Sequence, residues 1–450
     1  MTQDLEKFGY KQELKRALTL KDLIIYGLIF MVPIAPWGIY GVVADISNGM
    51  VPLAYLIGMV AMIFTALSYS RMAEAFPIAG SVYSYAQRGI NPHVGFIAGW
   101  AILLDYILVP ALLYLVSALW LKELIPAVPL WGWILIFIAI NTFINIRGIE
   151  FTAKTNLVIL IFELIALAAF LIVGVNYLLS TKGVSAFTLK PLYNPEGFNL
   201  SMVMTATSVA VLSYLGFDAI STLSEETHNP SKTVGSATVA TILIIAFLFM
   251  AQTYVAALIW PDYKNFPNID VAFYYIAERA GGMWLKNLTL WATVIAWGIA
   301  NALAAQAAIS RILYSMSRDE LLPKFLSKVH PTYKTPYLST LLVAVLSLIV
   351  SLALDLTSLT SLVNFGALTG FLFLHVSVFY YYFIKQKKRS GSDLLKYVVF
   401  PLIGFLVIFY VWISLEKSSK ILGFSWLIFG IVYSAIVTKG YKKIPPSLEV

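Results

Sequence analysis

The chain has 450 residues, of which 60% are hydrophobic and 12% charged, and its mean hydropathy is +0.82. A soluble domain cannot bury this much apolar surface, so the composition predicts an integral membrane protein. There is no cysteine, and the four histidines are scattered without metal-ligand spacing. We therefore expect no metal, no cofactor and no enzyme activity. The net charge of +8 is explained by membrane topology and does not require a nucleic-acid partner.

Residues 1–21 mix acids and bases and lack the short apolar core of a signal peptide, so we expect a cytosolic N-terminal segment. After it, runs of about twenty apolar residues predict an all-α membrane protein with twelve transmembrane helices. We place them near residues 22–46, 52–75, 94–121, 130–147, 155–179, 202–226, 236–260, 284–316, 338–355, 358–384, 396–414 and 420–438. With the N-terminus inside, 23 of the 31 lysines and arginines fall on the cytosolic side. Both termini are therefore predicted to be cytosolic, in a cell membrane.

The first apolar stretch contains the sequence MVPIAPWGIYG at residues 31–41. A proline inside a helix removes a backbone hydrogen bond and clashes with the preceding turn. Pro33 lies 12 residues after Lys21, so about 18 Å of helix rise places this interruption near the middle of the membrane. An interrupted backbone at that depth is tolerated where it lines a cavity or is buried in protein.

A second interruption is predicted in the sixth apolar stretch, where Gly216 and Asp218 occur in SYLGFDAIS at residues 213–221. Paired interruptions in corresponding helices of two halves indicate a transporter binding site. We assign residues 22–200 to the first five-helix half, 201–384 to an inverted second half, and 385–450 to two further helices and a cytosolic end. Either interruption alone is also compatible with a packing kink.

Two carboxylates lie inside predicted spans near these interruptions. Asp105 is about mid-membrane, where it either neutralises the ammonium group of a substrate or accepts hydrogen bonds from a neighbouring helix. Asp218 either binds a cation or carries a proton. Glu225, near the cytosolic end of the same span, is expected to join a gating or structural network with nearby charges.

Three segments resemble signatures of the amino acid/polyamine/organocation superfamily: EAFPIAGSVYSYAQRGINPHVGFIAGW (74–100), SYLGFDAISTLSEETHNPSKTV (213–234) and ISRILYSMSRDELLPKFLSKVHPTYKTP (309–336). The resemblance covers nearly the whole chain, and residues 90–110, 216–227 and 362–379 look closest to the putrescine importer branch. It implies a LeuT-like fold of five plus five inverted-repeat helices with broken first and sixth helices, two additional helices, and secondary active uptake driven by protons.

One departure from the superfamily pattern concerns the substrate. Amino-acid carriers of the superfamily usually have a Gly-Ser-Gly-like run at the first interruption, whose N–H groups hold the substrate carboxylate. Here Pro33 and Pro36 each lack a donor. The sequence therefore favours a substrate without a carboxylate.

Glu163 is a second departure. Many proton-coupled relatives carry a lysine seven residues after the asparagine that is Asn156 in this chain, whereas this chain has a carboxylate there. Burial favours the neutral form of a carboxyl group, so Glu163 is a candidate proton carrier. The alternatives are that it attracts a second ammonium group or pairs with a cation at a helix end.

The predicted function is import of putrescine or a related small organic amine by proton symport. The eighth span has no hydroxyl before Ser310, which disfavours sodium coupling. The alternative is an amino-acid transporter of the same superfamily, and the oligomeric state is left open. The candidate substrate-binding residues are Ile34, Ala35, Trp37, Gly38, Asp105, Tyr106, Tyr214, Gly216, Phe217 and Trp297, with Tyr40 as a further aromatic candidate.

Overall fold

The computed structural model describes residues 16–77, 81–147, 153–318, 322–333 and 335–443. The predicted N-terminal segment 1–21 and the C-terminal part after residue 385 therefore lie partly outside the described residues. The first half of the chain contains the helices α2 (Leu20–Met31), η1 (Ala35–Gly38), α3 (Tyr40–Ile46), α4 (Val51–Ala75), α5 (Ser81–Gly89), α6 (Pro92–Leu124), α7 (Leu130–Arg147), α8 (Ala153–Lys182), η2 (Gly183–Ala186), α9 (Leu200–Ala210), η3 (Val211–Tyr214) and η4 (Phe217–Glu226).

The second half is also helical. It contains α10 (Pro230–Ile259), η5 (Ile269–Val271), α11 (Ala272–Gly281), α12 (Met283–Thr293), η6 (Val294–Asn301), α13 (Ala302–Arg318), η7 (Lys324–Ser327), α14 (Tyr337–Ala353), α15 (Leu356–Val378), η8 (Phe379–Lys385), α16 (Gly391–Leu394), η9 (Leu395–Val399), α17 (Phe400–Ile413) and α18 (Lys417–Val437). Three of these segments, η6, η8 and η9, are π-helical continuations of longer helices.

Eleven helical segments of the described chain are long and apolar enough to cross a membrane, and the shorter apolar helix α14 corresponds to the remaining predicted span. The fold class is therefore an all-helical, multi-pass membrane protein. Two amphipathic helices, α5 and α11, were not among the predicted elements, because they are much shorter than the runs of about twenty apolar residues used to place the spans.

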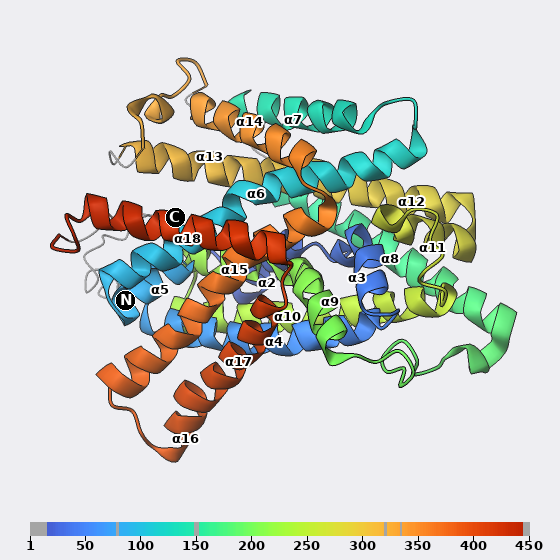
Figure 1. The fold of residues 1–450 in the computed structure, drawn as a ribbon, viewed down its shortest axis with the longest axis horizontal. Coiled ribbons are helices and arrows are strands. Elements are labelled where there is room, and N and C mark those ends of the chain that lie inside the picture. The colour runs from blue at the N-terminus through green and yellow to red at the C-terminus, as the bar shows by residue number, and fades with distance from the viewer. Residues whose placement is uncertain (1–15, 78–80, 148–152, 319–321, 334, 444–450) are drawn as a thin grey trace.

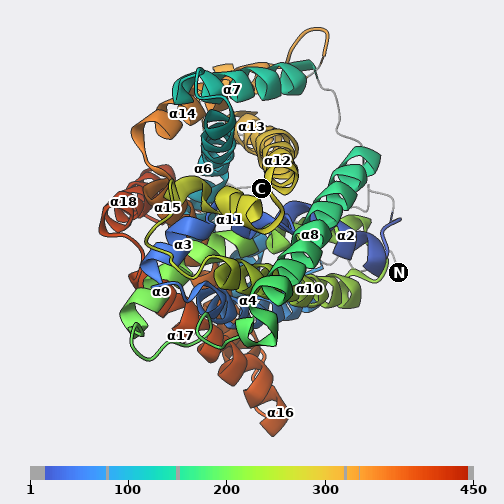
Figure 2. The same ribbon diagram turned by 90° about the vertical axis from the view of Figure 1, so that its right-hand side faces the viewer.

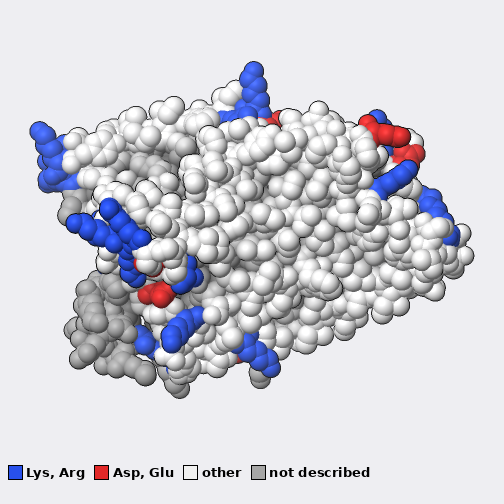
Figure 3. Space-filling view, turned by 90° about the horizontal axis from the view of Figure 1, so that it is seen from below, with Lys and Arg blue, Asp and Glu red and all other residues white. Residues whose placement is uncertain are grey.

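Most of the long helices run side by side along the long axis of the molecule (Figure 1), and several are seen end-on after the 90° turn (Figure 2). Near the centre, α10 packs against α4 and α2, while α15 packs against α6. The charged side chains of one face lie toward its margins and leave a broad central area without charge (Figure 3). Such a surface suits contact with lipid.

The first span is interrupted at residues 32–39, which we call the first break. Helix α2 ends at Met31, and Val32 has a φ of 54°. This conformation is strained for a β-branched residue, and the following Pro33 disfavours the helical alternative. After one 3₁₀ turn the chain resumes as α3 at Tyr40.

The sixth span is interrupted at Leu215 and Gly216, which we call the second break. Leu215 is extended, and Gly216 has a φ of 106°. A Cβ atom on Gly216 would lie 3.1 Å from the carbonyl oxygen of Phe30. Glycine is therefore required both by its own conformation and by the close approach of the two breaks.

Candidate substrate cavity

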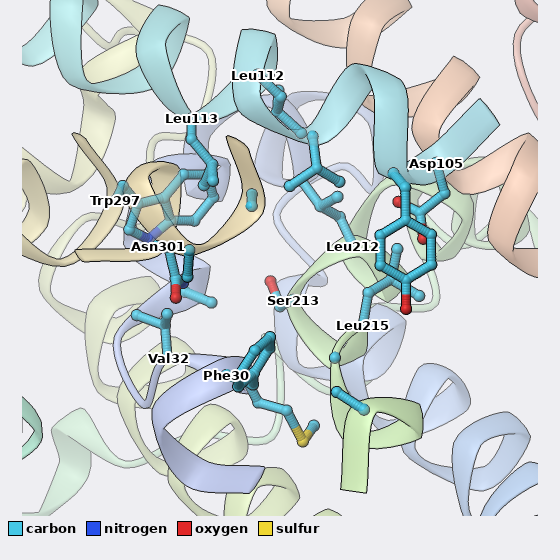
Figure 4. Close-up of a pocket in the computed structure, with 18 of the residues that line it drawn as sticks. Phe30, Val32, Asp105, Leu112, Leu113, Leu212, Ser213, Leu215, Trp297 and Asn301 are labelled. Carbon is cyan, nitrogen blue, oxygen red and sulfur yellow. The ribbon is translucent and has the colours of Figure 1, made fainter. Parts of the chain in front are cut away.

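A cavity of about 140 Å³ lies between the two breaks. This is about ten times the volume that one water molecule needs, so a small organic molecule can enter it. Figure 4 shows Asp105 on one side, Trp297 and Asn301 on the other, and the Ser213 hydroxyl between them. The residues that line the cavity are Phe30, Met31, Val32, Ala35, Asp105, Tyr106, Val109, Leu112, Leu113, Leu212, Ser213, Leu215, Gly216, Asp218, Ala219, Trp297, Asn301, Ala304, Ala305 and Ala308.

Several residues expected to bind substrate from the sequence do line this cavity. They come from four separate elements: the first break, α6, the region of the second break, and the π-helical segment η6. These residues are Ala35, Asp105, Tyr106, Gly216 and Trp297, and Asp218, which was expected to take part in proton coupling, lines the cavity as well. The structure thus brings together residues up to 262 positions apart in the chain, from Ala35 to Trp297.

The other five expected substrate contacts lie in the packing around the cavity. Ile34 is fully buried, and the Trp37 ring stacks on Phe273 at 4.9 Å. Gly38 lies against the Trp297 ring, since a Cβ atom added to Gly38 would lie 3.0 Å from that ring.

The remaining two of these residues belong to the region of the second break. The Tyr214 hydroxyl donates to the Tyr55 carbonyl at 2.9 Å. Phe217 packs against Tyr69 and Phe371. The further aromatic candidate, Tyr40, packs edge-on against Phe273 and is also outside the cavity lining.

Pro33 and Pro36 shape the first break. The Pro33 carbonyl accepts a hydrogen bond of 2.9 Å from the Gln252 amide, which fastens the break to α10. Pro36 is buried in the 3₁₀ turn, and its carbonyl accepts from the Ile39 N–H. The side chain of Glu225 lies outside the described residues.

Glu163 lies on the buried face of α8 and is 4% exposed. It is not among the residues that line the cavity, but α8 contacts both α2 and η6, which do contribute to it. The Oε2 atom of Glu163 has no hydrogen-bond partner among the described residues. A buried, unpartnered carboxylate is costly unless it is protonated.

The cavity is electronegative. Its lining contains two carboxylates, Asp105 and Asp218, and no lysine, arginine or histidine among the described residues. The charge of Asp218 acts on both Asp105 and Tyr106. In addition, α2 ends at the cavity, and the C-terminal end of a helix carries partial negative charge. This arrangement attracts a cation.

Most backbone donors of the first break are already used. The N–H groups of Val32, Ala35 and Trp37 donate to the carbonyls of Leu28, Val32 and Ile34, and the two prolines have no N–H. The Ile34 N–H makes no backbone hydrogen bond with the described residues. A substrate carboxylate would therefore find few partners here.

At the second break, the backbone donors lie beside a carboxylate of the protein itself. The Asp218 carboxylate lies close to the backbone at Gly216, Asp218 and Ala219 and to the Ser81 side chain, and the Ala219 N–H donates to the Gly216 carbonyl. The positive end of η4 is thus already neutralised by Asp218.

Sequence reasoning missed Ser213 and Asn301, two polar residues in the cavity wall. The Ser213 hydroxyl shares a hydrogen bond of 2.8 Å with Tyr55. Asn301 is the last residue of the π-helical segment η6. An asparagine inside an otherwise apolar span was the signal available for it. Among the described residues no group of side chains could hold a metal ion.

A membrane-spanning helical bundle with a cavity between two broken helices defines a class of protein, the transporters that carry small molecules through such sites. The family comparison agrees with this class, because residues 35–439 match the family described as amino acid permease. The chain belongs to the amino acid permease family, within the amino acid/polyamine/organocation superfamily. It is a transporter and not an enzyme.

Individual relatives are named for different substrates. The chain is 33% identical over 447 residues to the low-affinity putrescine importer PlaP of Escherichia coli strain K12, covering 97% of each chain. It is 25% identical over 461 residues to the branched-chain amino acid permease BcaP of Bacillus subtilis, covering 96% of this chain and 95% of the permease. It is also 26% identical to the methylthioribose transporter of Bacillus subtilis, covering 96% of this chain and 93% of that transporter.

Proposed function

We propose that this transporter imports putrescine or a related small organic amine by proton symport. The observation that supports it best is the charge of the cavity, in which Asp105 and Asp218 face no cation of the described chain. An ammonium group placed there would form charge-assisted hydrogen bonds and relieve the repulsion between the two carboxylates. The similarity to a putrescine importer supports the same substrate class.

In this proposal the substrate contacts Ala35, Asp105, Tyr106, Gly216, Asp218 and Trp297 directly. Ile34, Trp37, Gly38, Tyr214 and Phe217 form the wall behind them, and Pro33 and Pro36 hold the first break open. Glu225 belongs to the gating region at the inner end of the sixth span.

For the architecture we propose twelve transmembrane helices in a LeuT-like arrangement. Residues 22–200 and 201–384 form the two inverted halves, and 385–450 form the additional helices. The excess of lysine and arginine in alternate loops supports cytosolic termini and insertion in the cell membrane. Transport would proceed by rocking of one helix bundle against the other.

For proton coupling we propose Glu163, with Asp218 as the second titrating group. Glu163 is buried, its Oε2 atom has no partner within the described part of the chain, and it lies on a helix that contacts α2 and η6. We expect Glu163→Gln to lose proton-driven accumulation while retaining exchange of labelled for unlabelled amine. Glu196→Gln, which changes an exposed carboxyl group, is the control. Unchanged pH dependence in Glu163→Gln would exclude Glu163 as the carrier.

Amino-acid transport is the second candidate function. It is supported by the similarity to the branched-chain permease BcaP and by the Ile34 N–H, which remains available for a carboxylate.

The deciding experiment is uptake of radiolabelled putrescine into proteoliposomes with an acidic exterior. The proposal predicts accumulation that a protonophore abolishes and that unlabelled amines, but not amino acids, inhibit. Active uptake of an amino acid without uptake of putrescine would overturn it in favour of the second candidate.

A further inference from the structure

The two sides of the cavity differ in their polar groups. Asp105 and Asp218 supply negative charge from α6 and η4, whereas η6 supplies a neutral amide, Asn301. Figure 4 shows Asn301 across the cavity from Asp105. We propose that Asn301 recognises the second ammonium group of an α,ω-diamine whose first ammonium lies at Asp105 and Asp218. This inference rests on the proposed amine function.

Asn301 differs from the amide side chains that are hydrogen-bonded within the membrane-spanning helices. Asn141 donates to the carbonyls of Phe137 and Gly298. Asn145, Gln252, Gln306 and Asn364 likewise donate to protein oxygens, at distances of 2.7–3.2 Å. Asn301 makes no hydrogen bond with any residue that the structure describes, although it is half-buried. Since polar groups inside proteins are normally paired, its amide is available for a ligand.

The local backbone places Asn301 in the wall. The π-helical turn that ends there widens the helix and changes which side chains face the cavity. Trp297 and Asn301 both line the cavity from this segment, while the residues that follow on the same side are alanines, Ala304, Ala305 and Ala308. Asn301 is thus the polar group on this wall that can accept a hydrogen bond from an ammonium group.

The cavity is also long enough for two separated charges. On α6 its wall extends from Asp105 to Leu113, and eight residues of helix span about 12 Å. An extended diaminobutane is shorter than that. The intervening wall is formed largely by apolar side chains, including Val109 and Leu212, which suit a methylene chain.

The same arrangement discriminates against monoamines. An amine of equal length with a methyl end would place an apolar group against the Asn301 amide and leave that amide unpaired. A site built to bond a polar substrate group rejects an analogue that lacks it for this reason. Asn301 therefore selects by the second charge of the substrate and not by its length.

The test is isothermal titration of the purified full chain with putrescine and, separately, with 1-aminopentane, which has the same chain length. We expect the unchanged protein to bind putrescine more tightly by about tenfold or more. Asn301→Leu should bring the two affinities together, by weakening putrescine binding and strengthening 1-aminopentane binding. Asn301→Asp should increase the preference for putrescine, because it adds a charge at the second end.

Asn287→Leu is the matched control. Asn287 belongs to the same predicted span, and its Oδ1 atom also lacks a partner, but it does not line the cavity. The ratio of the two amine affinities in Asn287→Leu should equal the ratio in the unchanged protein. If Asn301→Leu or Asn301→Asp keeps the original preference, or weakens both amines equally, the role of Asn301 is excluded while the amine function stands. If the unchanged protein binds neither amine, both the proposed function and this inference fail.

Discussion

The first break and the second break face the same cavity, but different residues build them. In the first break, Pro33 and Pro36 remove donors covalently, and three of the remaining N–H groups bond within the break. In the second break the donors are present, but the Asp218 carboxylate lies beside them. Both constructions reduce the capacity to bind an anion.

The comparison separates two functions that broken helices can have. A break supplies a cavity because the backbone leaves the helical path, and it supplies an ion site through the groups that remain unpaired. Here the charged groups that line the cavity are carboxylates. The two breaks should therefore respond differently to mutation. At the second break a substitution can remove the Asp218 carboxylate, whereas at the first break the replacement of a proline restores a backbone N–H.

Removal of the Asp218 carboxylate should have the largest effect. We expect Asp218→Ala to weaken amine binding by about 10- to 100-fold, because charge-assisted hydrogen bonds are lost. It should also increase inhibition by amino acids, because backbone donors at the second break become free. Asp105→Asn is the matched variant and should weaken amine binding without that increase. Competition assays measure both effects, and identical behaviour of the two variants would contradict the assigned role of Asp218.

The next prediction concerns the backbone of the second break. Gly216→Ala forces a side chain into a φ of 106°, which costs about 1–2 kcal/mol, and places its Cβ 3.1 Å from the Phe30 carbonyl oxygen. The thermal midpoint of the purified protein should fall. Gly197→Ala is the control, since its Cβ would have no neighbour closer than 3.5 Å. Equal midpoints for the two variants would show that the contact between the breaks is unimportant.

Restoring a donor in the first break should have a smaller effect. Pro36→Ala returns one N–H, and one hydrogen bond corresponds to roughly a two- to tenfold change in affinity. Inhibition of putrescine uptake by amino acids should increase by that factor. Pro401→Ala, in α17 and away from the cavity lining, should cause no increase. No change in Pro36→Ala would show that donors in the first break do not limit carboxylate binding.

The smallest expected effect lies in η5, which packs against α3 beyond the first break. Burial, and then the nearby Asp355 carboxylate, raise the pKa of Asp270. The stability that the neutral carboxyl group supports is present below the unfolded pKa of about 4 and is lost as pH rises through the higher folded pKa. Between about pH 4 and pH 8, the Asp270→Asn variant should therefore lose less stability than the unchanged protein does. Parallel melting curves for both proteins would contradict this.

The sequence predicted features that depend on local backbone chemistry. Pro33, Gly216 and the apolar spans mark the breaks and the helices because each acts on its own segment. The direction in which each side chain points from its helix was not predictable in the same way. In helices that are apolar on all sides, hydrophobic pattern does not indicate a buried face. The 3₁₀ turn at Trp37 and the π turn at Asn301 also change the angular spacing on which such arguments depend.

The most direct test of the central claim is competition for binding on the purified protein, with radiolabelled putrescine displaced by unlabelled putrescine or by leucine. The account predicts that putrescine displaces the label and that leucine does not at similar concentrations, because the cavity offers carboxylates and few free donors. Displacement by leucine at concentrations equal to or below those of putrescine would contradict it.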